Sequence, residues 1–69
     1  MRVICKVKEL MDARGLSQLQ VSRETGINPA AIGKLYRNQI TRYDTKTLET
    51  LGDFFGCKSI SELIEFTSE

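Results

Sequence analysis

Residues 17–38 read SQLQVSRETGINPAAIGKLYRN, and this stretch decides the fold. Ser17, with Gln20 three residues later, has the pattern of a capping box at the start of a helix. Gly26 supplies the positive φ that a sharp turn between two helices requires. The stretch therefore predicts a short helix, a tight turn at Gly26 and a second short helix that ends near residues 37–38.

The second of these helices has two unlike sides. Asn28 fits its N-cap, and Pro29 fits its first position, where a missing N–H group costs nothing. At about 100° per residue, Ile32 and Leu35 point to one side and are expected to be buried. The opposite side carries only small and basic residues at helical spacing, which are Ala30, Gly33, Lys34 and Arg37.

The remainder of the chain predicts further short helices. One is expected from about Ile4 to Arg14 and another from about Asp44 to Gly56, since apolar residues recur there at helical spacing. Ser59 and Glu62 form a second capping box that predicts a short last helix. The fold class is therefore all-α, a compact bundle of four to five short helices with a helix-turn-helix at the second and third.

The two ends of the chain leave an alternative open. Residues 64–67 and residues 2–5 both contain β-branched or aromatic side chains, which favour strands. The ends can therefore pair as two short strands in place of the helical turns expected there.

Length and composition restrict the class of protein. The chain has 69 residues, so we expect one domain over residues 1–69, with 41% hydrophobic and 28% charged residues. It has no apolar run of the ~20 residues that cross a bilayer, and its first residues are too charged for a signal peptide, so we expect a cytoplasmic protein.

Composition also argues against a catalytic or metal site. The chain has no histidine and only two cysteines, Cys5 and Cys57. A zinc site needs about four ligands, so we expect no metal, no cofactor and no enzymatic activity. The two cysteines are expected to be reduced core residues, and a disulfide between them is the alternative.

The net charge of +1 conceals a strong polarity along the chain. Residues 1–43 contain eight Lys and Arg against three Asp and Glu, a net of +5. Residues 44–69 contain two Lys against six Asp and Glu, a net of −4. Such a chain can offer a basic face to phosphates while it stays nearly neutral as a whole.

The small, basic face of residues 30–37 suits the major groove of DNA. The two small residues let the helix backbone approach the groove closely. Lys34 can reach a guanine edge, and Arg37 can reach a phosphate or a base. Ala30 can contact a thymine methyl group. An alternative without DNA binding stays open, in which Lys34 and Arg37 are ordinary solvated charges and Gly33 only permits close packing on a neighbouring helix. The further candidate contacts to DNA are Ser17, Gln18, Asn28, Pro29, Gly33, Asn38, Gln39 and Arg42.

Four segments together resemble the Cro/lambda-repressor-type helix-turn-helix family, also called the Xre family, and particularly its compact single-domain members. The segments are VKELMDARGLSQ, ETGINPAAIGKLYRN, YDTKTLETLGDFFGC and SELIEF, which cover most of the chain. The resemblance implies a lambda-repressor-like bundle that binds double-stranded DNA, commonly as a two-fold dimer.

The resemblance also implies roles for individual residues. Gln18 would contact a phosphate or an adjacent base, and positions 28–30 and 34 would contact bases and backbone. Pro29 and Ala30 depart from the polar base readers of related repressors, so specificity is expected to rest more on Lys34, Arg37 and DNA shape. Ser22 stands where the family usually has Ala, and its hydroxyl is expected to bond the carbonyl of Gln18.

Two function classes remain. The leading hypothesis is a sequence-specific transcriptional regulator, because the basic face favours DNA. The alternative is a protein-interaction module, such as an antitoxin or anti-repressor, with weak or no DNA binding. A homodimer is expected because one short helix reads only about 4 to 5 base pairs, and its surface is expected at Ile60, Leu63 and Phe66.

Overall fold

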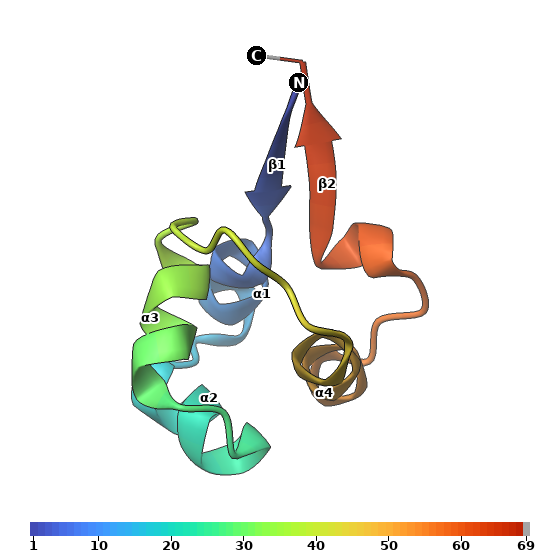
Figure 1. The fold of residues 1–69 in the computed structure, drawn as a ribbon. Coiled ribbons are helices and arrows are strands. Elements are labelled where there is room, and N and C mark those ends of the chain that lie inside the picture. The colour runs from blue at the N-terminus through green and yellow to red at the C-terminus, as the bar shows by residue number, and fades with distance from the viewer. Residues whose placement is uncertain (69) are drawn as a thin grey trace.

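A computed structural model describes residues 1–68 of the chain. Within this range four α-helices pack around one core, and a two-stranded sheet formed by the two ends of the chain projects from it (Figure 1). The expected helical bundle is confirmed. In chain order the elements are β1 (Arg2–Cys5), α1 (Val7–Arg14), α2 (Gln18–Thr25), α3 (Pro29–Tyr36), α4 (Thr45–Phe55), the 3₁₀ helix η1 (Ile60–Glu62) and β2 (Ile64–Thr67).

The predicted starts of α2, α3 and α4 are confirmed by their capping hydrogen bonds. Ser17 and Gln20 form the reciprocal capping box of α2, at 3.1 and 2.9 Å. The Asn28 side chain accepts the backbone N–H of Ala30, and that of Asp44 accepts the N–H of Thr47. These side chains satisfy backbone donors that the first turn of a helix leaves unpaired. None of the helices within residues 1–68 is long and apolar enough to span a bilayer.

The N-terminal boundary of the first helix was predicted wrongly. α1 begins at Val7 and not at Ile4, because residues 2–5 pair antiparallel with residues 64–67, with Val3 opposite Phe66. The β-branched side chains of this segment favour the extended backbone. The strand pairing that the sequence left open is therefore the structure adopted.

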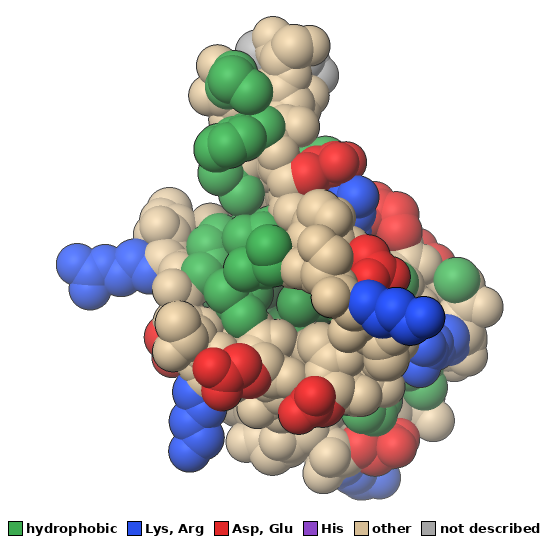
Figure 2. All heavy atoms as spheres, turned by 90° about the vertical axis from the view of Figure 1, so that its right-hand side faces the viewer, with side chains coloured by type: hydrophobic (Ala, Val, Ile, Leu, Met, Phe, Trp, Pro, Cys, Tyr) green, Lys and Arg blue, Asp and Glu red, His purple; other side chains and the backbone are tan. Residues whose placement is uncertain are grey.

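The sheet and the neighbouring η1 (Ile60–Glu62) keep large apolar side chains in contact with solvent. Phe66 is 68% exposed, Ile60 56% and Val3 42%. With Ile64 they line a shallow, almost wholly apolar hollow beside the strands. Figure 2 shows hydrophobic side chains gathered along the projecting sheet and on the body directly below it.

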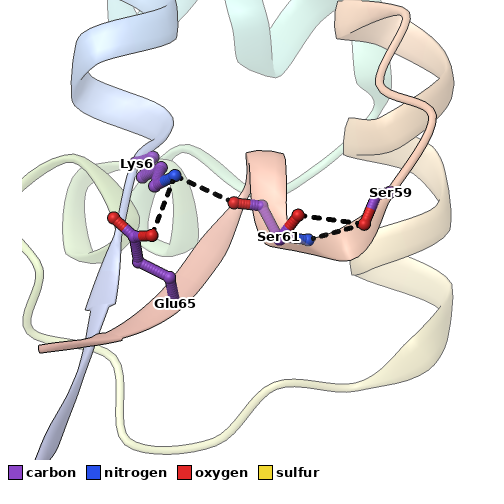
Figure 3. Close-up of polar contacts among 4 residues, drawn as sticks. All are labelled: Lys6, Ser59, Ser61 and Glu65. Carbon is purple, nitrogen blue, oxygen red and sulfur yellow. Dashed lines mark hydrogen bonds and ion pairs between the residues drawn. The ribbon is translucent and has the colours of Figure 1, made fainter.

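Lys6 ties the sheet to the body where β1 meets α1. Its ammonium group lies 3.2 Å from a carboxylate oxygen of Glu65 and donates to the carbonyl oxygen of Ser61 at 2.9 Å (Figure 3). Its backbone N–H donates to the carbonyl of Leu63 at 2.7 Å. One residue thus fixes the start of α1 against both η1 and β2.

The predicted last helix is a single 3₁₀ turn. Its capping box forms as expected, with Glu62 accepting the backbone N–H of Ser59 at 3.1 Å. Leu63 then turns into the core, where it is 2% exposed, and the chain continues as β2. Leu63 therefore does not belong to the exposed dimer surface expected from the sequence, because the core of so short a chain uses it.

The core draws at least one side chain from each helix α1 to α4. Its apolar members are Cys5, Val7, Met11, Val21, Ile32, Leu35, Leu51, Phe55 and Leu63. Cys5 and Cys57 are free thiols, as expected, and burial raises the pKa of both. Arg14 donates to the carbonyl of Phe55 at 2.6 Å, so a cation caps the C-terminal end of α4.

A three-residue polar cluster holds α3 beside α1. Asp12 accepts hydrogen bonds from the Lys8 ammonium at 3.1 Å and from the Tyr36 hydroxyl at 3.0 Å. The Lys8 nitrogen also lies 5.5 Å from the centroid of the Tyr36 ring. The bonds from Lys8 and Tyr36 lower the pKa of the Asp12 carboxyl, and the same contacts raise the pKa values of Lys8 and Tyr36.

This cluster predicts an acid-dependent contact between α1 and α3. A carboxyl whose pKa is lowered by folding stabilises the folded state above its ordinary pKa and loses that contribution as the pH falls below about 4. We expect an NMR titration to give Asp12 a lower pKa than an ordinary aspartate. Tyr36→Phe should move it part of the way back, since the Lys8 contact remains.

Tyr43→Phe is the control, because Tyr43 packs against the core and is not one of the three residues of this cluster. An Asp12 pKa that is unchanged in Tyr36→Phe would show that the hydroxyl contact contributes nothing in solution.

Candidate nucleic-acid interface

The turn between α2 and α3 is fixed by backbone and hydroxyl contacts. Gly26 adopts φ 77°, and its N–H donates to the carbonyl of Ser22 at 2.9 Å. The buried Ser22 hydroxyl donates to the carbonyl of Ile27 at 2.6 Å. The expected bond from Ser22 to the Gln18 carbonyl is therefore wrong, because the turn brings a nearer unpaired carbonyl. The hydroxyl pins the turn to α2.

Burial of one side sets the orientation of α3. Ile32 is 0% exposed and Leu35 1%, and both pack in the core as the sequence predicted. The other side of the helix faces solvent, with Ala30, Lys34 and the capping residue Arg37 exposed. The predicted separation into an apolar side and a small, basic side is therefore confirmed.

Gly33 departs from the exposed face on which the sequence placed it, because it is buried. A Cβ at this position would lie 3.2 Å from Arg37 Nη1 and 3.2 Å from Gln18 Oε1. The cover thus comes from two polar side chains of the candidate interface itself, one from α2 and one from the end of α3. The Nε of Arg37 also donates to Gln39 Oε1 at 2.9 Å.

The loop after α3 is held by Asn38. This residue has φ 57°, the left-handed conformation that Asn tolerates better than most residues. Its side-chain oxygen accepts the backbone N–H of buried Cys5 at 2.9 Å. The oxygen of Asn38 therefore serves the fold, whereas Gln39 and Arg42 in the same loop stay exposed.

The loop and α3 together enclose a shallow hollow. It is lined by Asn28, Ala30, Ala31, Lys34, Gln39, Ile40, Thr41 and Arg42. Five of the predicted site residues are among them, so the structure brings both ends of the candidate site together. The sequence does not reveal that Ala31 and Ile40 form part of its wall, because Ala31 falls beside the buried Ile32 and Leu35 in the helical pattern and Ile40 lies in a loop.

The other predicted site residues lie at the helix starts or beneath the face. Ser17 and Asn28 use their side-chain oxygens as caps, and the backbone N–H of Ser17 also donates to Gln20. Their part in an interface would therefore fall to the backbone N–H groups that the caps leave free and to the remaining polar atoms. Pro29 is exposed in the first turn of α3 and has no N–H group to offer. Gln18 is half-buried against Gly33.

The chain matches the model of one protein family, the Cro/C1-type HTH DNA-binding domain, over residues 6–69. The match includes all four α-helices and the second strand. Searches of curated proteins and of solved structures gave no match.

The geometry of the loop predicts a stability effect at Asn38. Asn38→Ala removes the acceptor for a part-buried N–H group and retains a positive φ, so it should lower the free energy of unfolding by about 1–3 kcal/mol. Asn38→Gly loses the same acceptor but accepts the φ without strain, so its loss should be smaller. Urea unfolding followed by circular dichroism measures both.

Gln39→Ala, one residue along the same loop, is the matched control and should unfold close to wild type, because its partner Arg37 is on the surface. Equal stabilities for Asn38→Ala and wild type would contradict the anchoring role of Asn38.

Proposed function

Because the chain belongs to the Cro/C1-type helix-turn-helix DNA-binding domain family, we propose that it is a sequence-specific regulator of transcription that places α3 in the major groove of double-stranded DNA. The exposed side of α3 carries this proposal. It combines small residues with Lys34 and Arg37, while Ile32 and Leu35 are buried behind it.

The proposal assigns different contacts to different parts of this surface. Lys34, in mid-helix and exposed, is long enough to reach the O6 and N7 edge of a guanine. Ala30 is placed for contact with a thymine methyl group, and the low polarity of Pro29 and Ala30 shifts part of the selectivity to DNA shape.

Phosphates on the two sides of the groove are assigned to the ends of the surface. The start of α2 presents the backbone N–H of Gln18, which the capping box of Ser17 and Gln20 does not use, together with the Ser17 hydroxyl and the positive end of the helix dipole. Gln39 and Arg42, on the other side of α3, extend from the loop that Asn38 anchors. These groups would fix the position of α3 without reading sequence.

A homodimer is part of the proposal. One α3 spans about 4 to 5 base pairs, and a two-fold dimer would place two recognition helices about 34 Å apart on a palindrome. The exposed apolar side chains of the terminal sheet and of η1, above all Phe66 and Ile60, supply a surface of the kind that dimers cover. The proposal includes no enzymatic activity and no cofactor. It places the protein in the cytoplasm.

DNA binding of this kind predicts a steep salt dependence. About three to five phosphate contacts per monomer should contribute a slope of about −3 to −5 per bound chain in a plot of log affinity against log salt concentration. Arg42→Ala should reduce the magnitude of the slope by about 1 per bound chain and weaken all duplexes alike. Titration of a pool of random duplexes at several salt concentrations measures both.

Lys58→Ala is the matched control, since it removes the same charge from the exposed segment after α4, outside the candidate interface. No binding at low salt, or an affinity that ignores salt and sequence, would contradict the proposal and favour the protein-interaction module.

The dimer predicts a dependence of mass on concentration. We expect light scattering to show a weak dimer in solution that tightens on a selected duplex, with two chains bound per duplex. Phe66→Ser should raise the protein concentration at which the dimer forms, because the variant loses the most exposed aromatic side chain of the sheet.

Leu19→Ser serves as the control in the absence of DNA, because Leu19 is 54% exposed on α2, outside the terminal sheet. One chain per duplex at saturation on an asymmetric site would overturn the dimer.

A further inference from the structure

Gly33 is buried in the middle of a surface that is otherwise open, and the cover is Arg37. The two residues are one turn apart, and a long side chain on a helix leans back toward the residue four positions earlier. The space above Gly33 that a Cβ would occupy is bordered by Arg37 Nη1 at 3.2 Å and Nη2 at 3.5 Å. The guanidinium group of the exposed Arg37 therefore lies back over Gly33, along the surface of the helix.

Two glutamines border the guanidinium group. On the loop side, Gln39 Oε1 accepts the Nε–H of Arg37 at 2.9 Å. On the α2 side, Gln18 Oε1 lies 3.2 Å from the same Cβ position as Arg37 Nη1. Arg37 is thus oriented through Nε, and the two terminal nitrogens keep their donor groups for another partner.

The position of this group on the surface determines what it would meet. The start of α2 lies to one side of it and the loop with Gln39 and Arg42 to the other, and both are assigned to phosphates above. A group between these two flanks faces the floor of the groove, where the base edges are. A guanidinium presenting two parallel N–H donors matches the O6 and N7 acceptors of guanine.

We propose that Arg37 is a specificity-determining residue that reads a guanine, with Gly33 providing its seat and Gln39 acting as its positioning residue. The inference rests on the proposed function and refines it, because it transfers Arg37 from a general phosphate-or-base contact to one defined base. The glycine leaves room for the guanidinium group of Arg37 and for the Gln18 side chain from α2, which border it equally closely.

Pre-organisation explains why three residues are needed. A free arginine side chain samples many rotamers and loses that freedom when it binds. The contact with Gln39 and the flat seat on Gly33 restrict it before DNA arrives, so a smaller loss remains for the binding step. The fork is then already oriented toward the groove.

The test begins with duplexes selected from a random pool by the wild-type chain. Each G·C pair of the selected site is replaced in turn by A·T, and dissociation constants are measured for all duplexes and for a scrambled one. We expect one G·C pair per half-site, distinct from the pair assigned to Lys34, at which wild type discriminates by roughly 5- to 150-fold. Arg37→Lys, which keeps the charge but loses the fork, should abolish that preference and retain affinity for scrambled DNA.

Gly33→Ala and Gln39→Ala test the seat and the positioning residue. Both should reduce discrimination at the same base pair. Gly33→Ala should fold at least as stably as wild type, because alanine favours the helix and the two contacts are with the far ends of flexible side chains. Gly52→Ala in α4 is the matched control, since a Cβ there meets nothing within 4 Å, and it should retain full discrimination.

A readout without DNA separates positioning from general stability. In ¹⁵N relaxation of the free protein, the Nε–H of Arg37 should be ordered in wild type and mobile in Gln39→Ala. Gln39→Glu keeps an acceptor oxygen, so it should restore this order and the base preference while lowering affinity for every duplex.

Two results would overturn the inference. Variants that weaken all duplexes equally and retain the wild-type preference would make Arg37 a phosphate contact. An Arg37 side chain that is equally mobile with and without Gln39 would remove the positioning role. A wild-type chain that selects no duplex would instead contradict the proposed function itself, and the inference with it.

Discussion

The burial of Ile32 and Leu35 is the constraint on which the rest of the molecule depends. Rotating α3 far enough to expose either side chain would cost about 1.5–3 kcal/mol, a large part of the stability of so short a chain. The rotation of α3 about its own axis is therefore fixed by the core. The residues on its opposite side, Lys34 and Arg37 among them, are presented by a helix that cannot turn away.

Polar contacts extend this constraint beyond the helix. Tyr36 and Asp12 join the end of α3 to α1, and the Asn38 side chain joins the following loop to the backbone of Cys5 in β1. The candidate interface and the terminal sheet are therefore linked through Asn38, where the loop after α3 passes the end of β1 (Figure 1). A dimer held by the sheet would thus be mechanically connected to the loop that borders the candidate interface.

Local rules predicted the parts of the fold that depend on neighbours in sequence. The caps at Ser17, Asn28 and Asp44 and the turn at Gly26 need only a few adjacent residues, and all are found in the structure. The start of α1 was missed because residues 2–5 fit a helical pattern as well as a strand. Only their partner strand, about sixty residues away, decides between the two.

The candidate site shows the same division. Its basic side followed from helical spacing, but the covering of Gly33 did not, because it depends on the rotamer of Arg37 and on the loop that brings Gln39 back. The roles of Asn38 in the loop and of Leu63 in the core were likewise hidden. Each role depends on a contact with a segment that is distant in sequence, and neither an asparagine nor a leucine indicates such a contact by its residue type alone.

The most direct measurement is an NMR titration of the ¹⁵N-labelled chain with a selected duplex, which locates the contact surface on the chain. The account predicts that amide shifts concentrate at the start of α2, along α3 and in residues 37–42, while α4 changes little. Changes confined to the terminal sheet and η1, with α3 unperturbed, would contradict the claim that the exposed side of α3 meets DNA.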